Sequence, residues 1–208
     1  MRVLAGVHGG RHPDVELEEE RVEVGGRELR LLVPPDAEAL LDEEAFEREE
    51  YLPYWAELWP SGVRLARALA GRDLRDALVL ELGCGLGVPS ITAALAGAAV
   101  LATDWSPHAI DLLRTNAERN GTRLEAAVSS WLDPRRELDG APWDLVLAAD
   151  VLYERRNTDL LLDLLPRLGD EVLLADPGRP HLAGFLERAA EAWEVEEDAP
   201  IFRLERRA

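Results

Sequence analysis

The sequence predicts an α/β fold in which a mostly parallel sheet of seven strands is covered by helices on both faces. From residue 78 onward, short aliphatic runs alternate with longer segments whose apolar residues recur with helical spacing, and this alternation is typical of a parallel sheet. With 208 residues, 47% of them hydrophobic, the chain is large enough for one such domain with a modest N-terminal addition. Only a short turn separates the last two aliphatic runs, so we expect the final strand to run antiparallel to the others.

Each element of this fold follows from the local sequence. Strands of a parallel sheet are short and aliphatic, as in Leu78-Val79-Leu80, and helices begin near serine or proline, as at Ser106-Pro107. On this basis we expect strands near 78–82, 99–103, 124–128, 143–149 and 171–175, followed by a terminal pair at 193–197 and 201–206. We expect helices near 61–70, 87–96, 106–120, 156–167 and 180–192.

A small extension precedes this domain. Arg21–Val24 and Glu28–Val33 flank Gly25-Gly26, an arrangement that predicts a β-hairpin with a two-residue turn. Pro34-Pro35 ends the hairpin, and Asp36 is placed to cap an acidic helix that ends near Glu50. We therefore divide the chain into an acidic extension at residues 1–50, consisting of a loose tail, the hairpin and this helix packed on the core, and a main domain at residues 51–208.

The charge is strongly negative and unevenly distributed. The formal net charge is −18, and residues 14–50 hold 15 acidic side chains against 4 arginines. Such a field repels phosphate backbones, so nucleic acid is not expected as a partner, whereas a basic, lysine-bearing protein surface would be attracted. Greater solubility, or adaptation to a salty host, is an equally good explanation of the charge.

Several other classes of protein are excluded by composition. No apolar run approaches the roughly 18 residues that a membrane span needs, so we expect no membrane partner. Cys84 is the single cysteine, and no His/Cys cluster has metal-ligand spacing, so we expect neither an internal disulfide nor a metal. All 23 basic residues are arginine. We expect a cytoplasmic, bacterial enzyme that is a monomer or a weak dimer.

The turn after the first strand of the main domain carries the strongest local signal. Gly83, Gly85 and Gly87 occupy alternate positions, where glycine lets a ligand lie directly against the backbone. A dinucleotide fingerprint needs its third glycine at position 88, which is valine. Glu81 precedes the turn, where its carboxylate suits an ammonium group better than a pyrophosphate. The spacing therefore favours a nucleoside that carries an amino acid, the chemistry of S-adenosylmethionine.

Two further strand ends supply candidate contacts for the nucleoside. Asp104 closes the second strand, 21 residues after Gly83, and at that distance it can accept hydrogen bonds from both ribose hydroxyls; it can also serve as a helix N-cap. Trp105 follows it at the expected adenine edge. Ser130 and Trp131 follow the third strand, where such folds bind adenine, although core packing is an equally good explanation of Trp131.

The fourth strand places an acid at the expected reaction centre. Asp150 ends this strand, and ligand sites of open parallel sheets lie at the carboxyl ends of their strands. Tyr153, three residues later, can lie at the mouth of the same ligand site. Asp144 begins the strand at the opposite end of the sheet and is expected to be structural.

Together these residues resemble the protein-lysine methyltransferases known as methyltransferase family 16. The resemblance runs from about Arg27 to Pro180 and includes the acid-x-x-aromatic motif Asp150-Val151-Leu152-Tyr153. Pro53–Pro60 and Asp176–Arg179 are most similar to the branch that methylates the electron transfer flavoprotein β subunit. The sequence departs from the family in its acidic N-terminal region and at Ser130, where many members place an acid.

The resemblance implies a Rossmann-like seven-stranded methyltransferase sheet, S-adenosylmethionine as cofactor, and a protein lysine as acceptor. It implies that Asp150 positions the lysine amine and that Tyr153 shapes the lysine channel. The expected cofactor-binding residues are Trp59, Glu81, Gly83, Cys84, Gly85, Gly87, Asp104, Trp105, Ser130, Trp131 and Ala149.

Three alternatives stay open at this point. A small-molecule N-methyltransferase with a nicotinamide-like acceptor would need a lid, and no lid insertion is evident in the sequence. A non-catalytic cofactor-binding module would not need Glu81, Asp104 and Asp150 together. An NAD(P)-dependent enzyme is disfavoured by the glycine spacing. The sequence leaves open which acceptor is used and how many methyl groups are added.

Overall fold

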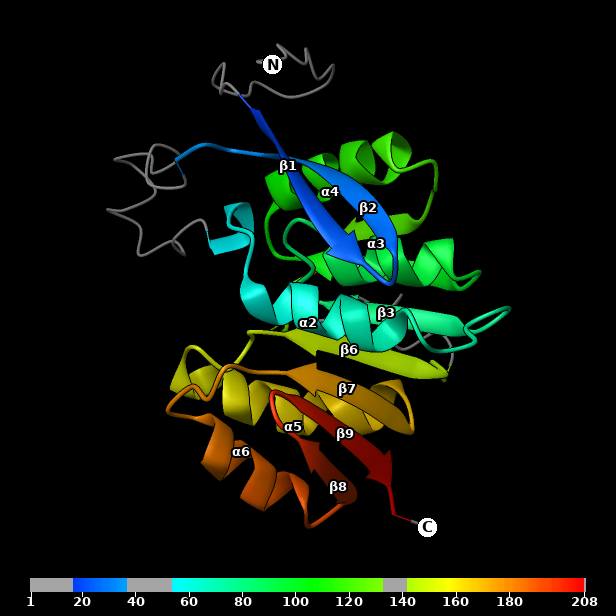
Figure 1. Ribbon diagram of the computed structural model, residues 1–208. Coiled ribbons are helices and arrows are strands. Elements are labelled where there is room, and N and C mark those ends of the chain that lie inside the picture. Colours follow the sequence, from blue (N-terminus) through cyan, green and yellow to red (C-terminus); the bar gives the residue numbers. More distant parts are fainter. Residues whose placement is uncertain (1–16, 37–53, 133–141, 208) are drawn as a thin grey trace.

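A computed structural model of the chain describes residues 17–36, 54–132 and 142–207, and shows a seven-stranded sheet preceded by a separate hairpin (Figure 1). The strand order is β5-β4-β3-β6-β7-β9-β8, and only β9 runs antiparallel to the rest. The strands are β3 (Leu78–Leu82), β4 (Ala99–Asp104), β5 (Glu125–Val128), β6 (Leu145–Ala149), β7 (Glu171–Ala175), β8 (Trp193–Asp198) and β9 (Ile201–Arg206). The helices are η2 (Tyr54–Ala56), α2 (Pro60–Leu69), α3 (Val88–Leu95), α4 (Pro107–Arg119), α5 (Arg155–Leu168) and α6 (Leu182–Ala189).

Alternation along the strands divides the core between the two faces of the sheet. Val79 of β3 packs with residues of α2 and α3, whereas its neighbour Leu80 packs with residues of α5 and α6. The same alternation separates Leu173 from Leu174 in β7. Successive side chains of a strand point to opposite faces, so the near-continuous aliphatic runs of these strands fill two cores at once. The expected α/β fold, with helices on both faces and an antiparallel last strand, is confirmed.

The hairpin of β1 (Glu18–Val24) and β2 (Arg27–Val33) is docked on α4 by two asparagines one helical turn apart. Asn116 accepts a hydrogen bond from the Leu32 N–H at 2.7 Å and donates to the Leu32 carbonyl at 3.2 Å. Asn120 makes the same pair of bonds with Arg30, both at 2.9 Å. The amide side chains thus satisfy one edge of β2 as a neighbouring strand would. Below this edge, Leu29 and Leu31 are buried against residues of α4.

Most sequence-based expectations for the fold are confirmed, with small changes at the ends. The hairpin begins three residues earlier than Arg21, and α6 ends at Ala189 and not near 192. The predicted loose tail and most of the predicted acidic helix lie outside the described residues, and the boundary at residue 50 stays a prediction. No described helix has the length and apolar character to cross a membrane.

Candidate active site

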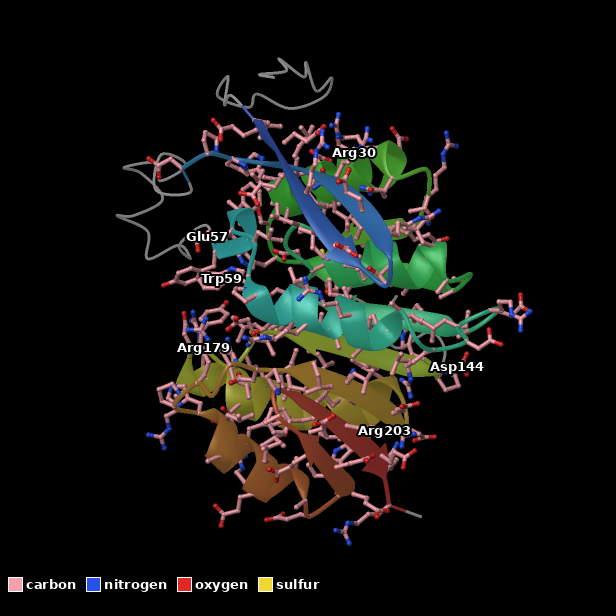
Figure 2. All side chains as sticks on the ribbon, in the orientation of Figure 1. Arg30, Glu57, Trp59, Asp144, Arg179 and Arg203 are labelled. Carbon is pink, nitrogen blue, oxygen red and sulfur yellow. The ribbon has the colours of Figure 1, made fainter. Side chains whose placement is uncertain are left out.

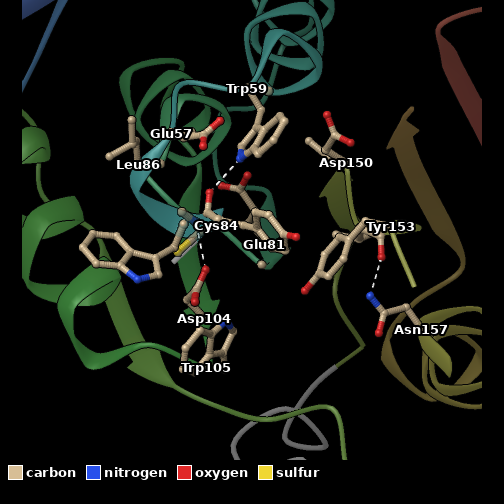
Figure 3. A pocket seen from close by; sticks show the side chains of 18 of the residues that line it. Glu57, Trp59, Glu81, Cys84, Leu86, Asp104, Trp105, Asp150, Tyr153 and Asn157 are labelled. Carbon is tan, nitrogen blue, oxygen red and sulfur yellow. Dashed lines mark hydrogen bonds between the residues drawn. The ribbon is translucent and has the colours of Figure 1, made fainter. Parts of the chain in front are cut away.

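A cavity of about 280 Å³ lies where β3, β4 and β6 end, and the functional residues expected from the sequence meet there (Figure 3). Figure 2 shows Glu57, Trp59 and Arg179 on this side of the molecule and Asp144 on the opposite side. Asp144 is structural, as expected, because its carboxylate accepts the Leu78 N–H at 2.8 Å. All thirteen expected site residues line the cavity: Trp59, Glu81, Gly83, Cys84, Gly85, Gly87, Asp104, Trp105, Ser130, Trp131, Ala149, Asp150 and Tyr153.

The glycine turn lets the backbone form one wall of this cavity. Gly85 has a φ of +49°, and a Cβ atom at this position would lie 3.2 Å from the carbonyl oxygen of Trp55. Gly87 has a φ of +79°, and a Cβ atom there would come within 1.8 Å of Leu113 in α4. Both positions therefore need glycine, one for close approach to the aromatic segment and one for packing of α3 on α4.

Glu81 is a buried carboxyl group at the base of the turn. Its carboxylate accepts a hydrogen bond from the Ser90 N–H at 2.9 Å and another from the Ser90 hydroxyl. Burial raises the pKa of Glu81 to about 8, and the two Ser90 hydrogen bonds oppose this rise only in part. At neutral pH the group is therefore mainly protonated, and an arriving cation would favour its ionised form.

Asp104 ties the glycine turn to the end of β4. One of its carboxylate oxygens accepts the Gly85 N–H at 3.0 Å, and the other accepts the Ser106 N–H at 3.0 Å. Burial raises the pKa of Asp104 to about 6, against the opposing effect of these backbone donors. The N-cap of α4 is Ser106, whose hydroxyl accepts the Ala109 N–H, so the N-cap explanation of Asp104 was wrong.

The segment after β5 contributes a hydroxyl group without a partner. Ser129 is buried, lines the cavity, and its Oγ has no hydrogen-bond partner among the described residues. Its N–H is bonded to the Asp104 carbonyl at 2.8 Å. The hydroxyl of Ser130, the serine chosen from the sequence, instead accepts the Leu132 N–H at 3.3 Å. Trp131 does both things expected of it, because it lines the cavity and packs against the core.

Asp150 sits at the mouth in a backbone conformation that is rare outside glycine. Its φ is +61°, its side chain is 6% exposed, and its N–H is bonded to the Ala175 carbonyl at 2.8 Å. Such strain persists only where the surroundings impose it, and it collects at functional sites. The segment that follows Asp150 is held to the start of α5, because the side-chain amide of Asn157 donates to the Val151 carbonyl at 2.8 Å. Tyr153 lies beside the mouth, with its ring centroid 5.3 Å from that of Tyr54.

Arg179, after β7, binds Asp150 directly. The two groups form an ion pair with Nε 2.5 Å from Oδ1, and the guanidinium lies 5.4 Å from the ring centroid of Trp59. Trp59 is itself fixed because its indole N–H donates to the Tyr54 carbonyl at 2.7 Å. The mouth is therefore a small assembly of one carboxylate, one guanidinium and three aromatic rings.

These features fit S-adenosylmethionine, the cofactor that the family resemblance implies. The unpartnered Ser129 hydroxyl suits a nucleoside base or ribose, and Gly83, Gly85 and Gly87 line the cavity with backbone atoms alone. Asp104 and Glu81 offer carboxyl oxygens for the ribose hydroxyls and the ammonium group. Among the described residues, no group of His, Cys, Asp or Glu side chains is arranged to hold a metal ion.

Arg179, Ser129 and Asn157 are among the cavity residues that were not predicted as site residues. Arg179 was part of the family resemblance without an assigned role, Ser130 was predicted in place of its neighbour Ser129, and Asn157 was not predicted. The available signal for Asn157 was its position: it is a polar residue in the first turn of the helix that follows the loop after Asp150.

Comparison with known proteins places this site in a family. The electron transfer flavoprotein β subunit lysine methyltransferase of Xenopus laevis is 39% identical over 134 residues, which cover 61% of this chain and 53% of the relative. A protein N-lysine methyltransferase of Danio rerio, METTL21A, is 38% identical over 128 residues, covering 57% of this chain and 58% of the relative. The chain spans about half the length of these curated relatives.

A solved structure agrees with the fold. The Thermus thermophilus 16S rRNA N2 G1207 methyltransferase, in complex with AdoMet and guanosine, superposes with a TM-score of 0.65. The match is 18% identical and covers 95% of this chain and 52% of that one, so it shows the fold alone. A family model described as lysine methyltransferase matches residues 49–175, and the chain therefore belongs to the lysine methyltransferase family.

Proposed function

We propose that this protein transfers methyl groups from S-adenosylmethionine to the side-chain amine of a lysine in a protein substrate. The observation that supports it most strongly is the position of Asp150, a strained and nearly buried carboxylate at the mouth of the cavity. The family supports the same reaction. When bound, the cofactor supplies an electrophilic methyl group on a sulfonium.

The acceptor amine must be neutral to attack that methyl group. A free lysine has a pKa of about 10.4, so roughly one in 2,500 is neutral at pH 7, a deficit of about 4–5 kcal/mol. The site must offset this deficit by desolvation and by the arrangement of its charges.

The residues of the chain have separate tasks in this reaction. Glu81, Asp104 and the glycine turn bind the cofactor, with Ser129 as a further polar contact. Asp150 orients the incoming amine, and Tyr153 together with Tyr54 borders the channel through which it enters. Much of the acceleration then comes from alignment of the amine with the methyl group.

The electron transfer flavoprotein β subunit is the candidate substrate, because relatives that carry its name are up to 39% identical to this chain. Neither the family nor these relatives give support to a nicotinamide-like acceptor or to a non-catalytic module. The cytoplasmic location, the bacterial source, the absence of nucleic-acid and membrane partners, and the monomer or weak dimer remain predictions.

The test is incubation with radiolabelled S-adenosylmethionine and a cell lysate whose lysines are either free or chemically blocked. The enzyme itself contains no lysine, so methylation of its own lysine side chains cannot contribute to the signal. Label that appears in a protein band and is lost on blocking supports the proposal, and the purified electron transfer flavoprotein β subunit tests the candidate substrate. Label that survives blocking contradicts it.

A further inference from the structure

The cavity is acidic, and Arg179 is the one basic residue among the described residues that line it. The ionisable groups facing the mouth come from every surrounding element: Tyr54 and Glu57 from the η2 segment, Glu81 and Cys84 from β3 and its turn, Asp104 from β4, Asp150, Tyr153 and Glu154 after β6, and Arg179 after β7. Five of these are carboxyl groups. Glu154 forms its own ion pair with Arg156 at 2.5 Å. Arg179 forms its ion pair with Asp150.

Arg179 is held in place from three sides. The buried Asp176 accepts the Gly178 N–H at 2.8 Å and the Arg179 N–H at 2.7 Å with one oxygen, and this shapes the loop after β7. The guanidinium then meets Asp150 at 2.5 Å and the face of Trp59 at 5.4 Å from its ring centroid. A side chain fixed in this way is ready before the substrate arrives.

An isolated carboxylate at the mouth would work against the reaction. If Asp150 stood alone, it would bind the lysine as an ammonium and stabilise the form that cannot attack. An arginine bound to the same carboxylate cancels that attraction while leaving the second carboxylate oxygen to orient the amine. Glu57, Glu81, Asp104 and Glu154 cannot do this, because they carry the same sign as Asp150 or are neutral.

Resting on the proposed function, we infer that Arg179 is a positioning residue that neutralises Asp150, so that the mouth accepts the lysine side chain as a free amine. Arg179 acts through Asp150 and needs no contact with the methyl group. This role also gives a purpose to the loop after β7, because the hydrogen bonds that Asp176 accepts from Gly178 and Arg179 place the Arg179 side chain beside Asp150.

Two inhibitors test the charge of the mouth without knowledge of the acceptor. S-adenosylhomocysteine lacks the methyl group, whereas sinefungin carries an amine at that position. In Arg179→Gln, the affinity for sinefungin relative to that for S-adenosylhomocysteine should rise by about tenfold at pH 7, because an unpaired Asp150 attracts the charged amine. The gain should vanish in Arg179→Gln combined with Asp150→Asn, which removes the attracting charge. Arg188→Gln is the matched control, since Arg188 pairs with Asp159 at 2.5 Å outside the cavity.

The pH dependence of methylation gives the second readout. In lysate labelling, the methylation rate of Arg179→Gln should rise at a pH about one unit higher than the rates of the wild type and of Arg188→Gln. Arg179→Met, which keeps an apolar stem near Trp59, replaces Arg179→Gln if that variant unfolds. Unchanged inhibitor preference with coincident pH profiles would overturn the inference. If the wild type labels no lysine, the proposed function fails instead, and the inhibitor preference still decides the role of Arg179.

Discussion

Replacing Glu81 by glutamine should stabilise the unliganded protein and weaken its binding of the cofactor. Glu81 is 1% exposed, and burial raises its pKa from 4.5 to about 8. A carboxyl group with a higher pKa in the folded protein holds its proton more tightly when folded. Stability is therefore lost as the pH rises above 4.5, and the loss levels off above about 8. Glutamine can accept the same two Ser90 hydrogen bonds and carries no ionisable proton.

The size of the effect follows from the pKa difference. Each pKa unit corresponds to about 1.4 kcal/mol. The raised pKa of Glu81 therefore lowers the free energy of unfolding by about 3 kcal/mol at pH 7 and by between about 4 and 5 kcal/mol at pH 9. At pH 5 the cost is below about 1 kcal/mol, because the carboxyl group of the unfolded chain, with its ordinary pKa of 4.5, has only begun to ionise. The stabilising effect of Glu81→Gln should therefore grow several-fold between pH 5 and pH 9.

Urea unfolding of the wild type and of Glu81→Gln at pH 5, 7 and 9, without cofactor, measures this difference. Asp104, whose pKa is also raised, to about 6, is present in both proteins, and its charge is the smallest of the causes of the shifted pKa of Glu81. Calorimetric titration with S-adenosylhomocysteine should show binding to Glu81→Gln weakened by about tenfold or more, because a charge-assisted contact is lost. Parallel stability profiles for the two proteins would refute the assignment of Glu81 as a buried, mainly protonated acid.

Three other substitutions probe separate parts of the molecule. Asp150→Ala should abolish turnover and leave the affinity for S-adenosylhomocysteine within a few-fold; persistent turnover would show that Asp150 does not orient the amine. Gly85→Arg should prevent cofactor binding, because even a Cβ atom at this position lies 3.2 Å from the Trp55 carbonyl, and normal affinity in titration would place the cofactor elsewhere. Asn116→Ala should cost about 2–3 kcal/mol in urea unfolding and speed hydrogen exchange at Leu32, since two buried backbone groups lose their partner; unchanged exchange would mean that the Asn116 bonds do not hold this edge of the hairpin.

The sheet and the cofactor side of the site were predictable because their signals are local. The aliphatic run of β3 and the three alternate glycines lie within ten residues, and the carboxyl ends of parallel strands meet at one edge. The positions of Asp104 and Asp150 follow from that edge once the strands are known. This is why residues from the ends of four different strands could be predicted to share one cavity.

The contacts that could not be predicted join distant parts of the chain. The ion pair between Asp150 and Arg179 spans 29 residues and depends on how the loops after β6 and β7 fold back. The docking of the hairpin on Asn116 and Asn120 spans 84 and 90 residues, although two asparagines one turn apart were a visible hint. Both Ser129 and Ser130 line the cavity, and the contact that separates them is local to the turn after β5: the Ser130 hydroxyl accepts the Leu132 N–H, whereas the Ser129 hydroxyl has no partner among the described residues.

The identity of the methylated side chain tests the central claim most directly. Protein labelled by the enzyme and radiolabelled S-adenosylmethionine is hydrolysed completely, and the labelled amino acids are separated against standards. We predict that the label elutes as methylated lysine and that it is absent when Asp150→Ala replaces the wild-type enzyme. Label that elutes as methylated arginine or histidine, or that remains in small molecules after protein is removed, would contradict the account.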